Sequence, residues 1–439
     1  MTVSTVISKD GVASDGEAGL PAKLDWFSRR AQNVFAWIPP RELEPQTLEQ
    51  IMNIGALPNA VAVAVMPDAH KGYGMPIGTA LATEGAVVPY AVGVDIGCGM
   101  VAVELGLTVE ELSPRLPEIL QGIFKRVPVG QPTKKDRNAG SFTERQDSET
   151  LREWFDTSDP VQGRGRHTIL AYDEAKQVRE RADRQLGTLG GGNHFIELQA
   201  DEAGSTWLML HTGSRGFGYA IGQAYYKRAL AWCERYHTPL PDKELAFLSL
   251  DTDDGQAYMR DMHFAMKFAE ESRSKIEFAC YDAMTDLVPG LGPIGTRRIE
   301  THHNFAAFEK HFGRKVVIHR KGAVKTIDDD NGGGRLVTIP GSMQTGSYIG
   351  MGKLSTLAMN TCSHGAGRTL GRKAMQRANI GADIRAEMTA QGIVLVCPET
   401  SDVLDEAGRA YKDIENVMKY QADLVEPVVK LRPLGVVKG

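Results

Sequence analysis

Short apolar segments that end in glycine-rich turns recur along most of the chain. Between residues 61 and 103, the runs "VAVAVM", "AVVPYAVGVDI" and "MVAVEL" alternate with the turns "HKGYGMPIG" and "IGCG". Such runs predict short β-strands joined by tight turns. Apolar residues at helical spacing predict helices around residues 109–125, 171–186, 217–236 and 255–285. We therefore expect an α+β fold, with central β-sheets surrounded by helices and an active centre built from the turns.

The strand and helix patterns interleave without an internal repeat, which predicts one large domain over residues 21–439. Residues 1–20 are predicted to form a flexible N-terminal tail without a secretory signal. The segment from about 130 to 162 is polar and lacks apolar periodicity, so we expect a loop or a surface insertion there.

Composition restricts the class of protein. No apolar run approaches the roughly 20 residues needed to cross a bilayer, and the five cysteines are scattered, as is usual in a reducing compartment. Both features predict a cytoplasmic protein. The formal net charge of −5 gives no general attraction to nucleic acid, although a local basic groove remains an alternative.

Polar side chains with metal-binding or proton-transfer chemistry lie at the ends of the apolar runs, most of them close to glycines. They are Asp68 and His70, Asp95 and Cys98, Asn193 and His194, His211, His302 and His303, and His364. Loops at strand ends converge on one place while the sheet holds them rigid. A thiolate, a carboxylate and several imidazoles suit Zn²⁺, Mn²⁺, Fe²⁺ or Co²⁺, and ligand chemistry alone does not choose among these ions. For Cys98 taken alone, a buried packing role is an equal alternative.

His364 stands in the stretch "NTCSHGAGRTL", between a cysteine–serine pair and a Gly-Ala-Gly turn. One interpretation is a loop histidine that bonds two backbone groups. The other is a nucleophile or phosphate contact, because flanking glycines let another group approach the ring. The turn "IPGSMQTGSYIGMG" offers N–H and hydroxyl donors that suit a phosphate, although such a turn is often only a turn.

Several motifs together resemble one family, the RtcB-type RNA-splicing ligases. They occur in family order from about residue 60 to residue 439, and they are "MPDAHKGYGMPIG", "GVDIGCGM", "LGTLGGGNHFIEL", "HTGSRGFG", "HHNF", "HRKGA", "IPGSMQTGSY", "SHGAGR", "AYKDIENV" and "LRPLGVVKG". The resemblance implies an enzyme that uses GTP and two Mn²⁺ ions. It would join RNA ends with a 3′-phosphate or 2′,3′-cyclic phosphate to 5′-hydroxyl ends, in tRNA splicing or RNA repair. The implied intermediates are a guanylyl-histidine and RNA-(3′)pp(5′)G, and an archease-type activator is an implied partner.

The resemblance also assigns roles to residues of this sequence. His364 matches the guanylylated histidine, and the metal ligands match Asp95, Cys98, His194, His211 and His303, with Cys98 bridging the two ions. The implied guanosine contacts are Asn193, His194, Phe195, Ile196, Glu197, His303, Asn304, Pro340, Gly341, Ser342, Met343, Ser347, His364, Gly365, Ala366, Gly367, Tyr411 and Lys438. Asp68 would orient the His364 ring or the incoming 5′-hydroxyl. For Arg215, Arg320 and Lys321, a contact to RNA phosphate and a structural salt bridge are equal alternatives.

The chain departs from the family pattern at Ser272 and Gly408, where we expect asparagine and proline, and its 130–185 region is longer than expected. These departures leave open a specialised paralogue that caps 3′-phosphate ends with GMP. A Mn²⁺-dependent phosphoesterase would need the same metal ligands but no special use for His364. A metal-stabilised RNA-binding protein without enzymatic activity is a further alternative.

Overall fold

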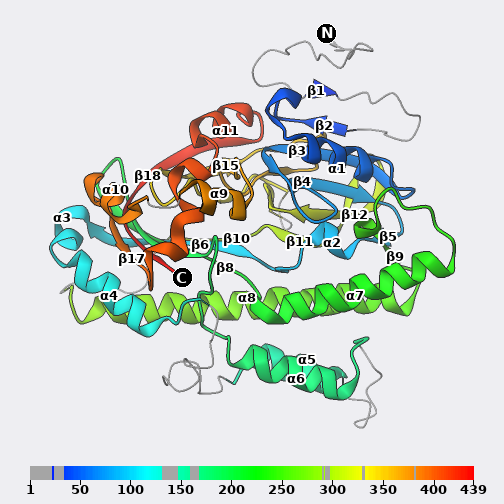
Figure 1. Ribbon diagram of the computed structural model, residues 1–439, viewed down its shortest axis with the longest axis horizontal. Helices are drawn as coiled ribbons and strands as arrows, with labels where there is room; N and C mark the ends of the chain where they lie inside the picture. The colour runs from blue at the N-terminus through cyan, green and yellow to red at the C-terminus, as the bar shows by residue number, and fades with distance from the viewer. Residues whose placement is uncertain are drawn as a thin grey trace.

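The computed structural model describes residues 22–23, 34–130, 147–158, 168–288, 291, 297–328, 332–379 and 382–439. The tail expected at residues 1–20 lies outside these ranges. The described part of the chain forms two large β-sheets with helices packed around them (Figure 1). The structure thereby confirms the expected α+β fold.

The first sheet has six strands in the order β1-β2-β3-β4-β12-β11. Its strands are β1 Ala22–Lys23, β2 Val34–Ala36, β3 Ala60–His70, β4 Ile77–Thr83, β12 Arg314–Lys321 and β11 Asn304–His311. Alternate residues of β3 enter different cores, because successive strand side chains point to opposite faces. Val63 and Val65 join one hydrophobic core, and Ala62, Ala64 and Met66 join another. Both faces of this sheet are therefore covered.

The second sheet has eight strands in the order β10-β6-β8-β7-β18-β15-β14, with β17 paired parallel to β18. Its strands are β10 Arg298–His302, β6 Gly99–Thr108, β8 Ser205–Thr212, β7 Phe195–Asp201, β18 Val425–Lys438, β15 Ser347–Gly352, β14 Leu336–Ile339 and β17 Val394–Val396. Two small ladders pair β13 Ala323–Lys325 with β16 Thr361–Ser363, and β5 Ala86–Val87 with β9 Leu248–Ser249.

Helices surround the sheets. The α-helices are α1 Pro45–Gly55, α2 Pro89–Val92, α3 Val109–Leu112, α4 Leu116–Arg126, α5 Glu149–Ser158, α6 Tyr172–Asp183, α7 Arg215–Arg235, α8 Asp253–Thr285, α9 Arg372–Ala378, α10 Ile384–Ala390 and α11 Ile414–Tyr420. Short 3-10 helices are η1 Pro40–Glu42, η2 Ser113–Arg115, η5 Lys243–Leu245, η6 Thr400–Glu406 and η7 Gly408–Ala410. Within the described residues, no helix has both the length and the apolar character that a membrane span requires.

The long helix α8 connects the two halves of the molecule. It begins after Thr252, whose hydroxyl caps the helix by accepting a hydrogen bond from the Gly255 N–H. Phe268, in the first half of the helix, packs in the core that also contains residues of β3, β4 and α7. Ile276 and Cys280, in the second half, pack in the core of α4 and the second sheet. In Figure 1, α8 runs along one side of both sheets.

One local prediction was wrong and another was wrong in part. A loop or a surface insertion was expected at about 130–162, and the loop alternative fails for residues 149–158, which form α5 with Leu151 and Trp154 fully buried. Their spacing of three residues is helical, and packing of this short apolar face stabilises the helix. The run "AVVPYAVGVDI" is not one strand, because Pro89 begins the short helix α2 after β5. Proline is favoured in the first turn of a helix, where no N–H partner is needed.

Candidate active site

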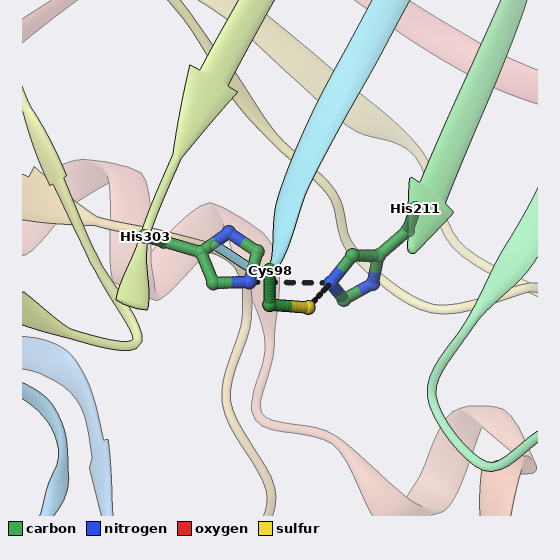
Figure 2. Close-up of side chains that lie close together, drawn as sticks. All are labelled: Cys98, His211 and His303. Atoms are coloured by element: carbon green, nitrogen blue, oxygen red, sulfur yellow. Dashed lines mark hydrogen bonds between the residues drawn. The ribbon is translucent and has the colours of Figure 1, made fainter. Parts of the chain in front are cut away.

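Thiol and imidazole side chains lie at the same end of four adjacent strands of the second sheet, β10, β6, β8 and β7. Cys98 directly precedes β6, His211 is the penultimate residue of β8, and His303 directly follows β10. In the sheet register, Gly99 of β6 pairs with His302 on one side and Thr212 on the other. Cys98 therefore lies between His211 and His303, as Figure 2 shows. His194 lies at the same end of the strands, because it directly precedes β7, whose first residue pairs with His211.

These side chains form two groups that share Cys98. In the first group, the Cys98 Sγ atom is 3.2 Å from His211 Nε2, which is 3.2 Å from His303 Nε2 (Figure 2). In the second group, Sγ is 3.6 Å from His194 Nε2, which is 3.1 Å from Asp95 Oδ2. Within each group, all donor atoms lie within 4.8 Å of one another. This arrangement could hold two cations with Cys98 as the shared ligand.

Backbone carbonyls fix which ring nitrogens face the cluster. The Nδ1 atom of His194 is 2.9 Å from the Leu189 carbonyl oxygen, and that of His211 is 3.2 Å from the Asn193 carbonyl oxygen. Each Nδ1 therefore carries the proton, and each Nε2 presents a lone pair to the cluster. His303 Nδ1 has no hydrogen-bond partner among the described residues. Lone pairs that converge in this way fit a metal ion.

Burial determines the protonation of the cluster. It is the largest cause that lowers the pKa of His211 and of His303 well below the usual value, and neighbouring imidazoles lower both further. Both rings are therefore neutral, as ligands must be. Burial and the Asp95 carboxylate raise the pKa of the Cys98 thiol well above its usual value. The thiolate form thus needs a compensating cation, which a bound metal would provide.

A buried arginine, Arg273 of α8, supports the cluster from behind. Its Nη1 atom donates hydrogen bonds to the Gly97 carbonyl at 3.0 Å and to the Thr212 carbonyl at 3.1 Å. Its Nε atom pairs with the Glu300 carboxylate at 2.7 Å. The side chain thereby fixes the turn before Cys98 relative to the end of β8. The sequence prediction did not include Arg273, because no local motif marks its distant partners.

His364 lies beside the metal-binding cluster. It directly follows β16, and its ring centroid is 4.8 Å from that of His303. Its Nδ1 atom is 2.6 Å from Oδ2 of the fully buried Asp68, which also accepts the His364 backbone N–H at 3.2 Å. The Nδ1–H donates to Asp68, so the Nε2 atom carries the free lone pair. The ring is therefore oriented as a nucleophile or general base would be.

Glycines make this contact sterically feasible. A Cβ atom at Gly322 would lie 3.0 Å from Cε1 of His364 and 2.2 Å from a methyl carbon of Ile77. Gly367 has a φ of +73°, and a Cβ atom there would lie 2.2 Å from the Asp68 carbonyl oxygen. A larger residue at Gly322 would displace Ile77 and crowd the His364 ring, and one at Gly367 would displace Asp68.

A cavity of about 850 Å³ adjoins the cluster and lies between residues of both sheets. Its lining includes the predicted guanosine contacts Asn193, Phe195, Glu197, His303, Asn304, Pro340, Gly341, Ser342, Met343, Ser347, His364, Gly365, Ala366, Gly367, Tyr411 and Lys438. Two predicted contacts do not line it. Ile196 points into the hydrophobic core, because it alternates with Phe195 and Glu197 along β7, and His194 belongs to the metal-binding cluster. The volume is large enough for a nucleotide-sized ligand.

A buried carboxylate, Glu406, organises one wall of the cavity. It pairs with Lys438 Nζ at 2.9 Å, Arg368 Nη1 at 2.9 Å and Arg372 Nη1 at 3.1 Å, and it accepts a hydrogen bond from the Tyr411 hydroxyl. Burial alone would raise its pKa, but Lys438, Arg372 and Arg368 together lower the pKa to about 2. Glu406 is thus ionised and fixes four side chains that line the cavity. It was missed in the sequence, where no motif marks it.

Glu197 presents a second carboxyl group to the cavity. Its Oε2 atom accepts a hydrogen bond from Gln199 at 2.6 Å, and Gln199 also contacts Ser347 Oγ at 3.1 Å. Burial raises the pKa of Glu197 to about 7, against the lowering effects of Gln199 and Lys438. Near neutral pH this group can accept hydrogen bonds from a ligand that carries N–H donors, and such a ligand would favour its ionised form.

The three basic residues considered as RNA contacts have different environments. Arg320 is fully buried and forms an ion pair with Glu309 at 2.5 Å. This geometry is that of a structural salt bridge, the alternative to a contact with RNA phosphate. Lys321 lines the cavity, where its Nζ atom donates to the carbonyls of Tyr73 and Tyr90. Burial lowers its pKa to about 7.

Arg215, at the start of α7, is near the metal-binding cluster. Its Nη1 atom is 3.3 Å from His194 Nδ1. Its Nε atom is buried and has no hydrogen-bond partner among the described residues. The side chain lies against Gly190, where a Cβ atom would be 2.1 Å from Nη1. Arg215 does not line the cavity described above, and its contact to RNA phosphate stays a prediction.

Comparison with known proteins identifies the family. Residues 50–439 match the family described as tRNA-splicing ligase RtcB. The chain belongs to the RtcB family. It is 34% identical over 409 residues to the RNA-splicing ligase RtcB of Escherichia coli (strain K12), a match that covers 92% of this chain and 96% of that protein.

Archaeal members of the RtcB family match over a similar length. The tRNA-splicing ligase RtcB of Pyrobaculum aerophilum is 33% identical over 440 residues, covering 90% of this chain and 91% of that protein. The tRNA-splicing ligase RtcB of Thermococcus kodakarensis is 32% identical over 442 residues, covering 90% and 92% respectively. These matches confirm the family that the sequence motifs indicated.

Proposed function

We propose that this RtcB-family chain is a GTP-dependent RNA ligase. It joins RNA ends that carry a 3′-phosphate or 2′,3′-cyclic phosphate to 5′-hydroxyl ends, in tRNA splicing or RNA repair in the cytoplasm. The observation that carries the proposal is the position of His364. Its ring is hydrogen-bonded to Asp68 through Nδ1 and lies against His303 of the metal-binding cluster. His364 also lines a nucleotide-sized cavity.

The first step forms a guanylyl-histidine. The free Nε2 lone pair of His364 attacks the α-phosphorus of GTP, a P–N bond forms, and the bond to pyrophosphate breaks. The ring becomes positively charged while Nδ1–H remains hydrogen-bonded to the Asp68 carboxylate, and the negative charge of this carboxylate stabilises the positive ring. An archease-type protein would act as an activator of this step.

Two transfers complete the reaction. An oxygen of the RNA 3′-phosphate attacks the guanylyl phosphorus, the P–N bond breaks, and RNA-(3′)pp(5′)G forms. The 5′-hydroxyl oxygen of the second strand then attacks the RNA-side phosphorus, loses its proton, and displaces GMP to leave a phosphodiester. A 2′,3′-cyclic phosphate is first opened to the 3′-phosphate by water.

The donor set supports two Mn²⁺ ions as cofactors. Asp95, Cys98 and His194 would hold one ion, and Cys98, His211 and His303 the other. When bound, such ions neutralise charge that develops on transferring phosphates. The mixture of sulfur, nitrogen and oxygen donors is also compatible with Zn²⁺, Fe²⁺ or Co²⁺. The choice of Mn²⁺ therefore rests on the family resemblance.

The cavity provides complementary groups for guanosine. Glu197 would accept hydrogen bonds from the N–H groups of the base, and Lys438 would provide a cation beside it. Ser347 and the Gly341–Met343 turn would supply further donors. The guanine base would thus lie against the second sheet, and the α-phosphate would lie beside His364.

The departures from the family pattern leave these groups in position. Ser272 is buried in α8, where its hydroxyl accepts a hydrogen bond from the Gly187 N–H at 3.1 Å. Gly408 donates its N–H to Gln344 Oε1 at 2.6 Å. Neither residue is a candidate metal ligand. We therefore favour complete ligation over a paralogue that only caps 3′-phosphate ends with GMP.

The test uses two labelled RNA strands, one with a 3′-phosphate and the other with a 5′-hydroxyl, incubated with GTP, Mn²⁺ and archease. A joined strand that resists phosphatase is expected, and it should depend on both GTP and the 5′-hydroxyl. Accumulation of capped RNA-(3′)pp(5′)G without joining would support the capping paralogue. Release of inorganic phosphate independent of GTP would overturn ligation in favour of a phosphoesterase.

A further inference from the structure

An exposed aromatic side chain, Tyr73, lies at the edge of the cavity. Its side chain is 65% exposed, although the residue lines the same cavity as His364. Tyr90 and Phe195, two other aromatic residues of this lining, are buried, and Tyr411 is half-buried and donates a hydrogen bond to Glu406. No described residue stacks on the Tyr73 ring. A large apolar surface is therefore left open to solvent beside the proposed reaction centre.

The backbone around Tyr73 is firmly held, so its exposure is not that of a loose loop. Gln50 makes two hydrogen bonds to Gly72, one to its carbonyl at 2.7 Å and one from its N–H at 3.1 Å. The Gly74 N–H donates to the Glu244 carboxylate at 2.5 Å. The Tyr73 carbonyl accepts a hydrogen bond from the Met75 N–H at 2.7 Å. Both neighbours of Tyr73 are thus fixed while its ring projects outward.

Tyr73 is connected to the reaction centre through two consecutive residues. Lys321 Nζ donates to the Tyr73 carbonyl, and Gly322 is packed against the ring of His364. Lys321 is the last residue of β12 in the first sheet, and Gly322 directly follows it. The proposed guanosine contacts Glu197 and Lys438 lie on strands of the second sheet. Tyr73 therefore lies on the wall of the cavity formed by the first sheet, in the same lining as His364.

We propose that the Tyr73 ring is a stacking platform for the last base of the RNA strand that carries the 3′-phosphate. The inference rests on the proposed function, because that strand must bring its terminal phosphate to His364. Aromatic side chains stack on any base, which suits an enzyme that accepts ends of different sequence. Lys71, two residues before Tyr73, is exposed and forms no ion pair with a described residue, so it provides a cation for the adjoining phosphate.

The experiment uses a short RNA with a 3′-phosphate and 2-aminopurine as its last base, whose fluorescence is quenched by stacking. Wild type, Tyr73→Ala and Tyr73→Phe are compared for RNA affinity and for quenching. The same samples are guanylylated, and transfer of GMP to the RNA is measured per guanylylated molecule. Tyr236→Ala is the matched control, because Tyr236 is 58% exposed and does not line the cavity.

The expected result is a roughly 10-fold loss of RNA affinity and loss of quenching in Tyr73→Ala. Tyr73→Phe should retain both, since it keeps the ring, and Tyr236→Ala should match wild type. Equal affinity and quenching in Tyr73→Ala and wild type would overturn the stacking inference while leaving guanylyl transfer intact. Loss confined to joining with the 5′-hydroxyl strand would overturn the assignment to the 3′-phosphate strand. A wild type that forms no guanylylated protein would overturn the proposed function itself.

Discussion

The Nδ1 atom of His364 lies 2.6 Å from the Oδ2 atom of Asp68, although the two residues are 296 positions apart in the chain. Asp68 is fully buried near the end of β3, and His364 follows β16. This hydrogen bond fixes both the ring orientation and the position of its proton. The Nε2 lone pair is thereby left for chemistry in the cavity.

Replacing Asp68 should slow guanylylation without unfolding the protein. Asp68→Ala removes the acceptor for Nδ1–H, and we expect the rate constant to fall at least about 100-fold. Asp68→Asn keeps an oxygen acceptor but loses the charge that stabilises the imidazolium, so an intermediate loss is expected. Single-turnover rates across pH provide the measurement, with thermal unfolding as the control. Unchanged rates in both folded variants would contradict a positioning role for Asp68.

Replacing Cys98 should weaken metal binding at both groups, because its Sγ atom is shared between them. For Cys98→Ala we expect metal affinity to fall at least about 10- to 100-fold. The absorption band from sulfur to Co²⁺ in the cobalt-loaded protein should also disappear. Cys280→Ser is the matched control, because Cys280 is equally buried but lies in the core around α8. A Cys98→Ala variant with full affinity for two ions would exclude the shared-ligand assignment.

Replacing Arg320 should reduce stability, since its side chain is fully buried and paired with Glu309. Arg320→Ala leaves the Glu309 carboxylate with only His311 at 2.9 Å and the more distant Lys325 at 3.6 Å as partners, and it removes the fully buried side chain. The loss of this buried pair should cost roughly 3 to 5 kcal/mol in the free energy of unfolding. Arg314→Ala, on the same strand, removes an exposed pair with Glu84 and should cost less than about 1 kcal/mol. Denaturant unfolding measures both. Normal stability combined with weaker RNA binding in Arg320→Ala would instead favour an RNA contact.

The raised pKa of Glu197 predicts a pH-dependent difference in stability. Because the folded pKa of about 7 exceeds the ordinary value of 4.5, ionisation in the folded state opposes folding. Wild type and Glu197→Gln should be equally stable below pH 4.5. The variant should gain an advantage as pH rises to 7, reaching about 3 kcal/mol at about 1.4 kcal/mol per pKa unit. Unfolding at several pH values, with the exposed Glu49→Gln as control, tests this, and a pH-independent difference would refute it.

The strand ends that carry Cys98 and His211 could be predicted from the sequence, because at each of them an apolar run, a glycine-rich turn and a polar residue occur together within a few positions. His303 has no glycine-rich turn beside it, and it was singled out as a metal ligand through the motif "HHNF" of the family resemblance. The helix α5 was missed because only Leu151 and Trp154 mark its buried face, within a polar segment. Propensity is weak evidence when one short face decides the packing.

Other parts of the site could not be predicted, because they depend on contacts between distant segments. Glu406 forms its ion pairs with Arg368, Arg372 and Lys438, which lie more than 30 positions away along the chain. Arg320 and Lys321 are adjacent in sequence, yet only Lys321 lines the cavity. Their alternation on β12 sends one side chain into the core and the other toward the site. The sequence alone does not show which face of β12 points toward the cavity.

The nucleophilic role of His364 is tested most directly by incubating the protein with α-labelled GTP, Mn²⁺ and archease, and then examining wild type and His364→Ala for covalent label. Acid-labile, base-stable label is expected on wild type and none on His364→Ala, with both proteins folded and binding metal. Peptide mapping should assign the label to His364. Equal labelling of the two proteins, or no label on wild type with metal bound, would contradict a guanylyl-histidine at His364.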